Sequence, residues 1–243
     1  SPCIVERSAN ISLAARRIVF GKFLNCGQTC VAPDYIYCDA AVYDDLMRAL
    51  VAEIRTQFGD ASLENPNYGH IVNRKHFDRL CGLIDPEKIA YGGRTAPENL
   101  QIEPTILRDV EWGDAIMQEE IFGPILPVRR YENFGDAIDQ LNDMPRPLAL
   151  YIFNEDKAIA RQVMTRLQFG GGCVNDTIIH LASNNLPFGG VGASGMGAYH
   201  GETGFRTFSH EKSIVDKATW FDLPVRYQPY DRVKDRLIRL FMR

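Results

Sequence analysis

The sequence predicts an α/β fold with an open, mostly parallel sheet flanked by helices. Two observations predict it. Apolar runs of strand length alternate with amphipathic helical periods along most of the chain, and no internal repeat or low-complexity segment interrupts that alternation. At 243 residues the chain can bury a full core, either as one domain or as one domain with a tail.

Two helices can be placed from the spacing of apolar residues in the first quarter of the chain. Asn10 is a suitable N-cap for a stripe made of Ile11, Ala14, Ala15, Ile18, Val19 and Leu24. A second stripe consists of Leu46, Leu50, Val51 and Ile54. We therefore expect helices at 11–24 and 41–58, each preceded by a short strand, at 3–5 and 35–38.

The same alternation continues through the middle of the chain, and the elements there are short. We expect helices at 74–83, 134–141 and 156–167. We expect strands at 89–91, 105–107, 125–129, 148–153 and 172–174.

The last sixty residues lose this regular pattern. Residues 183–204 are glycine-rich and nearly aperiodic, which predicts a long and functional loop. Residues 205–216 have strand character, with Phe208, Ile214 and Val215. We therefore divide the chain into a domain at 1–204 and a C-terminal strand and tail at 205–243.

The end of the tail predicts a basic amphipathic helix after Pro224 and Pro229. Residues 221–243 carry six cations and three anions, which gives a net charge of +3. Such a helix can lie on a membrane surface or pack on a partner subunit. We expect packing, because the apolar face of Val233, Leu237, Leu240 and Phe241 is short.

Charge and cysteine spacing exclude several classes of protein. The net charge is 27 − 31 = −4, and the basic residues are dispersed, so we expect no nucleic-acid partner. The six cysteines lack paired C-x-x-C spacing and the five histidines stand alone, so we expect neither a metal site nor a disulfide framework. A reducing, cytoplasmic location is the simplest interpretation.

Cys30 is the leading catalytic candidate, because it lies in a glycine-turned loop directly after the first helix. A thiol attacks a carbonyl as the thiolate, so it must be partly exposed and near groups that favour its ionised form. A lone cysteine is more often a small buried side chain, and that alternative stays open on this pattern alone. Cys26 could form a disulfide with Cys30, although we expect it simply to pack.

The motif Phe23-x-x-x-Gly27-Gln28-x-Cys30 resembles the cysteine signature of the aldehyde dehydrogenase superfamily. Three further segments agree in order, and they match the class three branch: 119–124, 172–176 with 185–192, and 195–201. The resemblance implies that the chain is a catalytic-domain fragment. The dinucleotide-binding domain and the general-base glutamate of the family would precede Ser1. We expect the fragment alone to be inactive.

The resemblance also implies residue roles and a cofactor, NAD or NADP. Cys30 would be the nucleophile, and Glu120 rather than Glu119 would bind the nicotinamide ribose. Phe122 would lie against the nicotinamide, although a plain core position is as reasonable from the sequence. Residues 205–216 would belong to an oligomerisation arm, and the parent enzyme would be a homodimer.

The resemblance is closest to coniferyl aldehyde dehydrogenases, so we expect an aromatic aldehyde to be oxidised to its acid through a cysteine thiohemiacetal and thioester. Fatty or aliphatic aldehydes are the alternative substrates. A thiol-dependent acyl hydrolase would use Cys30 without a nicotinamide, and the block around Glu120 argues against it. An inactive interaction fragment is the third alternative.

Several other motifs carry less weight. Residues 190–195 fit G-x-G-x-x-G, but Pro187 before them opposes the strand that a dinucleotide fingerprint needs. Asn175 and Asp176 end a predicted strand, and we expect them to form its turn. His180 and His200 have no adjacent carboxylate in the sequence, so we assign them packing or loop roles.

Overall fold

The computed structural model describes residues 1–241, and it divides into two compact units, Ser1–Phe208 and Ser209–Arg243. The first unit extends four residues beyond the boundary expected at 204, because a short helix, α6 (Gly201–Thr207), closes the long loop. The Thr207 hydroxyl donates to the carbonyl of Ala198 at 2.8 Å, which ties this helix back onto that loop.

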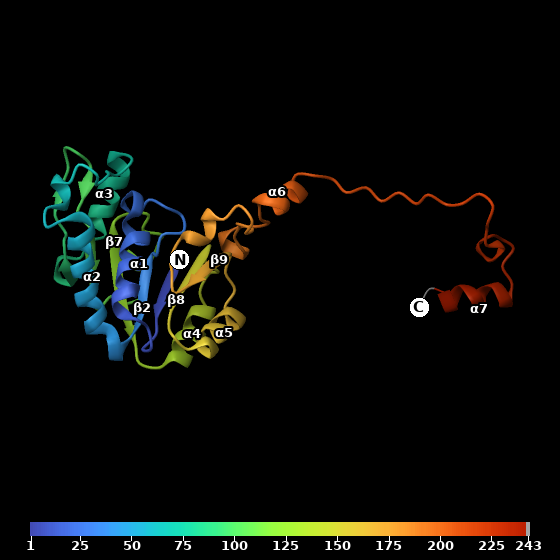
Figure 1. Cartoon of the computed structure of the whole chain (residues 1–243), viewed down its shortest axis with the longest axis horizontal. Coiled ribbons are helices and arrows are strands. Elements are labelled where there is room, and N and C mark those ends of the chain that lie inside the picture. The colour runs from blue at the N-terminus through green and yellow to red at the C-terminus, as the bar shows by residue number, and fades with distance from the viewer. Residues whose placement is uncertain (242–243) are drawn as a thin grey trace. The chain divides into compact units, whose positions relative to one another are not determined.

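The first unit is built on a seven-stranded sheet in the order β3-β6-β7-β2-β1-β8-β9 (Figure 1). Strand β3 pairs antiparallel with β6, and every other neighbouring pair is parallel. The strands are β1 (Pro2–Val5), β2 (Tyr35–Asp39), β3 (Ile89–Tyr91), β6 (Thr105–Leu107), β7 (Ile125–Tyr131), β8 (Ala149–Phe153) and β9 (Gly171–Val174). The expected parallel α/β sheet is confirmed.

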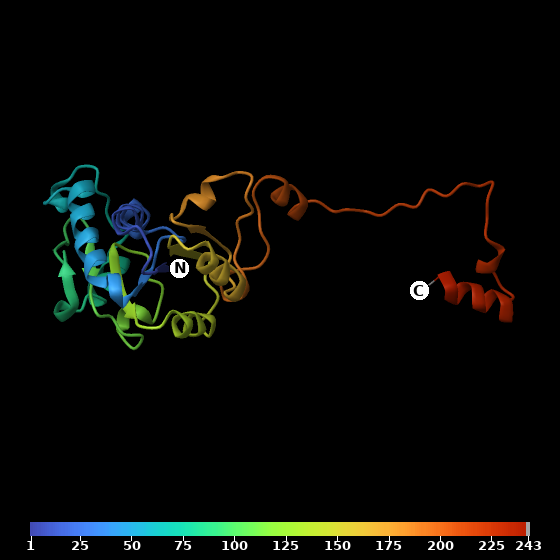
Figure 2. The ribbon, with the colours of Figure 1, turned by 60° about the horizontal axis from the view of Figure 1, so that its bottom comes forward.

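Helices cover both faces of the sheet because successive strand residues point to opposite sides. Cys3 and Val5 of β1 pack under α1 (Ile11–Phe23) and α2 (Tyr43–Phe58), whereas Ile4 packs on the other face. That second face is covered by α4 (Phe134–Asn142) and α5 (Lys157–Arg166), as two views of the ribbon show (Figures 1 and 2). The result is a three-layer α/β/α domain with an apolar core on each side.

The predicted elements agree with the structure to within a few residues. Asn10 caps α1, since its side chain accepts a hydrogen bond from the Leu13 N–H at 3.1 Å. Helix α3 (Arg74–Gly82) covers one end of the sheet, with Phe77 and Leu80 in a smaller core cluster. A two-stranded sheet of β4 (Thr95–Ala96) and β5 (Gln101–Ile102) was not predicted, because two residues carry no periodic signal.

The strand expected at 205–216 is wrong for its first three residues, and its pairing with a segment outside this chain, which the resemblance implies, stays a prediction. Its first residues continue helix α6, and an ion pair between Glu202 and Arg206 one turn apart supports that helix. The remaining residues pair with no strand in the described part of the chain. Apolar, β-branched residues favour a strand only where a neighbouring strand accepts their backbone hydrogen bonds.

The second unit ends in α7 (Arg232–Phe241), the basic amphipathic helix expected from the sequence. The carboxylate of Asp231 caps it, accepting hydrogen bonds from the backbone N–H groups of Val233 at 2.9 Å and Lys234 at 2.8 Å. Val233, Leu237, Leu240 and Phe241 are all exposed. Within residues 1–241, no helix is both long and apolar enough to cross a membrane.

Candidate active site

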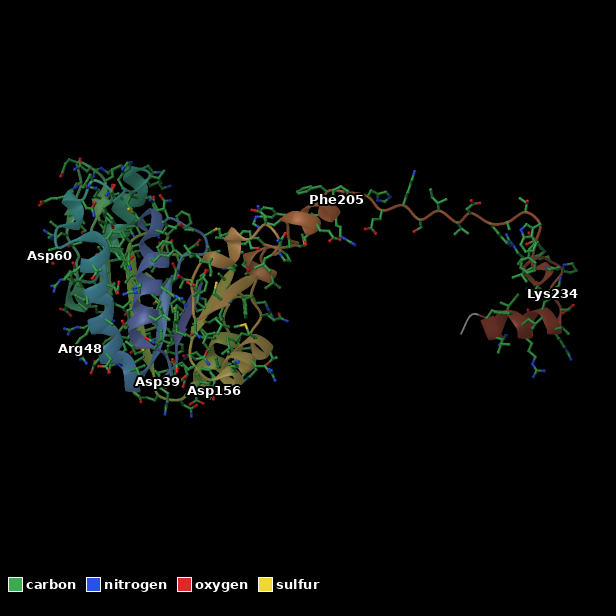
Figure 3. The ribbon with its side chains drawn as sticks, in the orientation of Figure 1. Asp39, Arg48, Asp60, Asp156, Phe205 and Lys234 are labelled. Carbon is green, nitrogen blue, oxygen red and sulfur yellow. The ribbon has the colours of Figure 1, made fainter. Side chains whose placement is uncertain are left out.

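The candidate site lies at the amino edge of the parallel sheet. The segments that lead into β1, β2, β7 and β8 together line a cavity of about 580 Å³, and Cys30, Asp34 and Glu120 are among its lining residues. Asp39 at the end of β2 and Asp156, which caps α5 just after β8, mark the opposite edge (Figure 3). Open α/β sheets usually bind ligands at the carboxyl edge, so the sequence pattern alone would have placed the site on the wrong side.

The Cys30 loop is built on an unusual backbone turn. Asn25, Cys26 and Gly27 follow one another with φ of 52°, 54° and 72°, all in the left-handed region. Only glycine adopts that region without strain, so two of the three positions cost free energy. The turn reverses the chain at the end of α1 and brings Cys30 out to the cavity.

Gln28 and Tyr151 fix this loop from two sides. The Gln28 amide donates to the His70 carbonyl at 3.0 Å and accepts from the Val72 N–H at 2.9 Å. The hydroxyl of Tyr151, a fully buried residue of β8, donates to the Val31 carbonyl at 2.6 Å. Cys30 therefore lies in a short stretch that hydrogen bonds fix at both ends, at Gln28 and at Val31.

Cys30 is the one exposed cysteine of the six, and all six are free thiols. Its backbone N–H bonds to no residue that the structure describes, so it can donate to a ligand. Cys26 is buried, and burial raises the pKa of its thiol to about 11. The packing role expected for Cys26 agrees with this geometry.

Glu120 lies in a segment whose backbone is held from two sides, by Arg79 of α3 and by Asp34 just before β2. Arg79 of α3 donates to the backbone carbonyls of Glu120 and Ile121 and to the side chain of Glu119. The carboxylate of Asp34 accepts the backbone N–H of Ile121 at 3.1 Å. Glu119 is therefore engaged with Arg79, whereas the exposed carboxylate of Glu120 forms no ion pair with a described residue.

The Cys30 loop and the Glu120 segment touch through two glycines. A Cβ added at Gly27 would lie 2.2 Å from the carbonyl oxygen of Gly123, far inside van der Waals contact. This close approach needs a residue without a side chain and with positive φ, and Gly27 meets both needs. The candidate nucleophile and the candidate cofactor ligand are thus fixed relative to each other by backbone contact.

The surroundings of Glu120 shift the pKa of its carboxyl group in opposite directions. Burial and the nearby Asp34 raise the pKa of Glu120, while Lys22 and Arg79 lower it. A carboxylate presented in this way can accept hydrogen bonds from two neighbouring hydroxyls, so the residues present fit the ribose of a nucleotide cofactor.

Phe122 does not lie beside Cys30 and Glu120 in the cavity lining. Its backbone is left-handed, with φ of 51°, and its carbonyl oxygen lies 2.7 Å from Nε2 of His76. The two rings are tilted against each other with centroids 6.3 Å apart. Its contact with a nicotinamide stays a prediction.

The remaining candidates form loops and turns. Asn175 exchanges two hydrogen bonds of 2.8 Å with the backbone of Asn154, and so closes a turn as expected. His180 packs between Tyr151 and Phe188, and burial lowers its pKa. Residues 190–195 lie in a loop with one short 3₁₀ turn rather than between a strand and a helix.

Sequence reasoning missed four residues that organise the site: Lys22, Asp34, Arg79 and Tyr151. The first three carry charge at positions where a helix ends or a strand begins, which charge patterning alone does not single out. Tyr151 is a polar aromatic inside a buried strand, and such a hydroxyl needs a hydrogen-bond partner. The need of a buried hydroxyl for a partner could have singled out Tyr151 from the sequence, but it would not have identified Val31 as that partner.

Comparison with known proteins gives a consistent result. The family profile described as "Aldehyde dehydrogenase family" matches residues 1–214. The chain is 49% identical over 245 residues to 4,4'-diaponeurosporen-aldehyde dehydrogenase of Staphylococcus aureus, covering 100% of this chain and 53% of that protein. It is 43% identical over 218 residues to the "Aldehyde dehydrogenase, dimeric NADP-preferring" of Rattus norvegicus, covering 90% of this chain and 48% of that protein.

Solved structures agree with these relatives. The substrate-bound state of Staphylococcus aureus AldH superposes with a TM-score of 0.96 at 48% identity, over 100% of this chain and 53% of that one. A 3,6-anhydro-L-galactose dehydrogenase in complex with NAP superposes with a TM-score of 0.74 at 30% identity, over 84% of this chain and 45% of that one. The chain spans about half the length of the curated relatives it matches.

Proposed function

Because this chain belongs to the aldehyde dehydrogenase family, we propose that it is the catalytic half of an NAD(P)-dependent enzyme that oxidises an aldehyde to a carboxylic acid. One observation carries the proposal: the exposed thiol of Cys30 and the carboxylate of Glu120 line the same cavity. A hydrolase that used Cys30 alone would have no need of a second segment fixed against the nucleophile loop.

Cys30 would act as the nucleophile. Its thiolate attacks the aldehyde carbon, a C–S bond forms, and the carbonyl electrons move to oxygen. The Cys30 N–H, which makes no hydrogen bond within the described chain, can donate to that oxyanion. Loss of the carbon-bound hydrogen as hydride leaves a thioester, and attack by water on the thioester releases the acid and restores the thiol.

NAD or NADP, when bound, supplies the hydride acceptor. Glu120 would hold its nicotinamide ribose, and the Gly27–Gly123 contact would keep that carboxylate at a fixed place relative to Cys30. The rat relative described as NADP-preferring supports a nucleotide of this class. The other walls of the cofactor site would come from the part of the longer relatives that this chain does not span.

For the substrate we propose coniferaldehyde or a similar aromatic aldehyde. A long apolar aldehyde is the second candidate, and the name of the Staphylococcus aureus relative favours it. We also propose that the intact enzyme is a cytoplasmic homodimer, a state that the name of the rat relative supports.

The test is NAD(P)H formation by a protein that joins this chain to the upstream half its relatives carry. Coniferaldehyde and a long aliphatic aldehyde are compared by kcat/KM, and Cys30→Ala should lower both by about 10³-fold or more. Cys81→Ala, in a helix away from the cavity lining, is the matched control and should keep full activity. Activity that survives Cys30→Ala would contradict the proposal.

A further inference from the structure

Lys22 is the most completely buried charged residue among residues 1–241. It lies in the last turn of α1, with 0% of its surface exposed. Its Nζ has no hydrogen-bond partner within the described residues, and it forms no direct ion pair there. A buried cation without a partner costs several kcal/mol, so packing alone does not explain a lysine at this position.

The charged groups that act on Lys22 come from the amino edge of the sheet. They are the carboxylates of Asp34, before β2, and of Glu120, before β7. The amino group of Ser1 adds a third charge, but only where the chain starts at this residue, because a peptide bond there carries none. Asp34 and Glu120 both line the cavity with Cys30. The backbone of Lys22 lies beside the Glu120 segment, because a Cβ added at Gly27 would be 3.2 Å from the Lys22 carbonyl oxygen and 2.2 Å from that of Gly123.

Two carboxylates at one site repel each other and resist ionising together. A nearby cation that does not itself line the cavity lowers that repulsion. The Asp34 carboxylate also holds the Ile121 N–H, so it must remain an acceptor for the Glu120 segment to stay in place.

We propose that Lys22 is the positioning residue for the Asp34–Glu120 pair, an inference that rests on the proposed function. Its ammonium group offsets the repulsion between the two carboxylates and favours the ionised form of Glu120, which is then ready to accept the hydroxyls of a nucleotide ribose. Lys22 touches neither substrate nor cofactor and acts only through these two residues.

The first test measures Glu120 directly in this chain by an NMR titration of its side-chain carboxyl carbon. Removing an opposite charge should raise the pKa of Glu120 in Lys22→Met above that in the wild-type chain. Lys88→Met is the control, because it removes the same charge from a lysine that is paired with Asp114 and lies outside the cavity lining. An unchanged Glu120 pKa in Lys22→Met would overturn the inference, whatever the enzyme assay shows.

The second test is the pH dependence of stability. Burial lowers the pKa of Lys22 to about 8, against 10.5 for an ordinary lysine, while Asp34 and Glu120 oppose the shift. Between these two values the folded chain has lost the proton and the unfolded chain retains it, so stability should rise with pH. Lys22→Met should remove that rise and increase the melting temperature at pH 7, because the cost of the buried charge is gone. A lower melting temperature at pH 7 would indicate a structural role instead.

The third test is kinetic and uses the protein joined to its upstream half. Lys22→Met should raise KM for NAD(P) about tenfold or more, as expected for a lost charge-assisted hydrogen bond, with a smaller change in kcat. Lys22→Arg, which keeps the cation, should restore part of the affinity. If the wild-type protein forms no NAD(P)H, the proposed function fails, while the NMR titration still decides the role of Lys22. An unchanged KM in an active Lys22→Met enzyme would contradict that role.

Discussion

At the scale of single residues, the reactivity expected of Cys30 depends on hydrogen bonds made by its neighbours. Gln28 and Val31 anchor the short stretch that contains it, and Cys30 itself makes no hydrogen bond with a residue that the structure describes. The exposed position removes the main objection to a catalytic cysteine, which is that lone cysteines are usually buried.

Alkylation should report this exposure in the chain as it stands. Iodoacetamide should label Cys30 before the other five cysteines, because three of those are buried and two are only partly exposed. Burial also raises the pKa of the Cys173 and Cys81 thiols, which slows their reaction further. Peptide mass mapping after short exposures measures the order, and faster labelling of Cys173 or Cys81 would contradict the prediction.

Tyr151 offers a second test at this scale. Tyr151→Phe removes the hydroxyl that donates to Val31 and leaves a buried carbonyl unsatisfied, which should lower the free energy of unfolding by about 1–3 kcal/mol. Tyr35→Phe is the control, because its hydroxyl contacts only the Met144 sulfur at 3.8 Å. Urea unfolding of the two variants should therefore separate clearly, and equal midpoints would show that the Tyr151–Val31 bond is weak.

At the scale of elements, the sequence predicted the sheet and its helices because each is amphipathic or apolar over many residues. The helix of 16 residues at Tyr43–Phe58 buries Leu46, Leu50 and Ile54 of the predicted stripe, and the fourth member, Val51, packs half-buried against the same core. The strand at 205–216 was misplaced only at its start, where residues 205–207 continue helix α6, and its pairing stays a prediction because no local pattern reveals a strand's partner.

The site was predictable only in part. Cys30 and Glu120 could be named from a family motif, and the structure places both on one cavity. That these segments meet through Gly27 and Gly123, some hundred residues apart, depends on tertiary packing. The burial of Lys22 could not be predicted from the sequence either, because a lysine at the end of a helix is usually solvated.

The contact between the two segments predicts a large effect of a small substitution. Gly27→Ala places a Cβ 2.2 Å from a backbone oxygen at a φ of +72°, so both crowding and backbone strain oppose it. Gly59→Ala is the matched control, with a φ of +81° and no atom within 4 Å. We expect the control to lose about 1–2 kcal/mol of stability and Gly27→Ala to lose at least about 2 kcal/mol more.

Chemical unfolding of both alanine variants measures this difference. Similar losses would mean that positive φ alone limits these positions, and that the backbone near Gly123 can move away without cost. The iodoacetamide rate at Cys30 in the same variants shows whether the loop has shifted.

At the scale of the whole molecule, the core and the tail are separable. Every buried residue of the described chain lies at or before Ile178, and the second unit contributes none. A chain that ends at Phe208 should therefore keep its melting temperature to within about 2 °C, since no apolar burial is lost. Val163→Asp in the shorter chain is the control. It places a charge at the buried position of α5 and should unfold the chain, which shows that the assay detects damage to the core.

The same pair of chains tests what the tail binds. We expect the tail to serve subunit packing rather than lipid, so anionic liposomes should pellet the two chains equally. Preferential pelleting of the longer chain would show that the exposed apolar face of α7 inserts into a bilayer. Light scattering on the longer enzyme, with and without residues 209–243, then measures the contribution of the tail to dimer formation.

The placement of the site at the amino edge has a practical consequence for engineering. Connections beside Asp39 and Asp156 lie at the opposite rim of the sheet (Figure 3), with the length of β2 between Asp39 and the segment that carries Cys30. Affinity tags, surface immobilisation points or inserted reporter domains placed there should leave turnover untouched. The rim that carries the candidate site has no such freedom, because Gly27 and Gly123 hold two of its turns backbone against backbone.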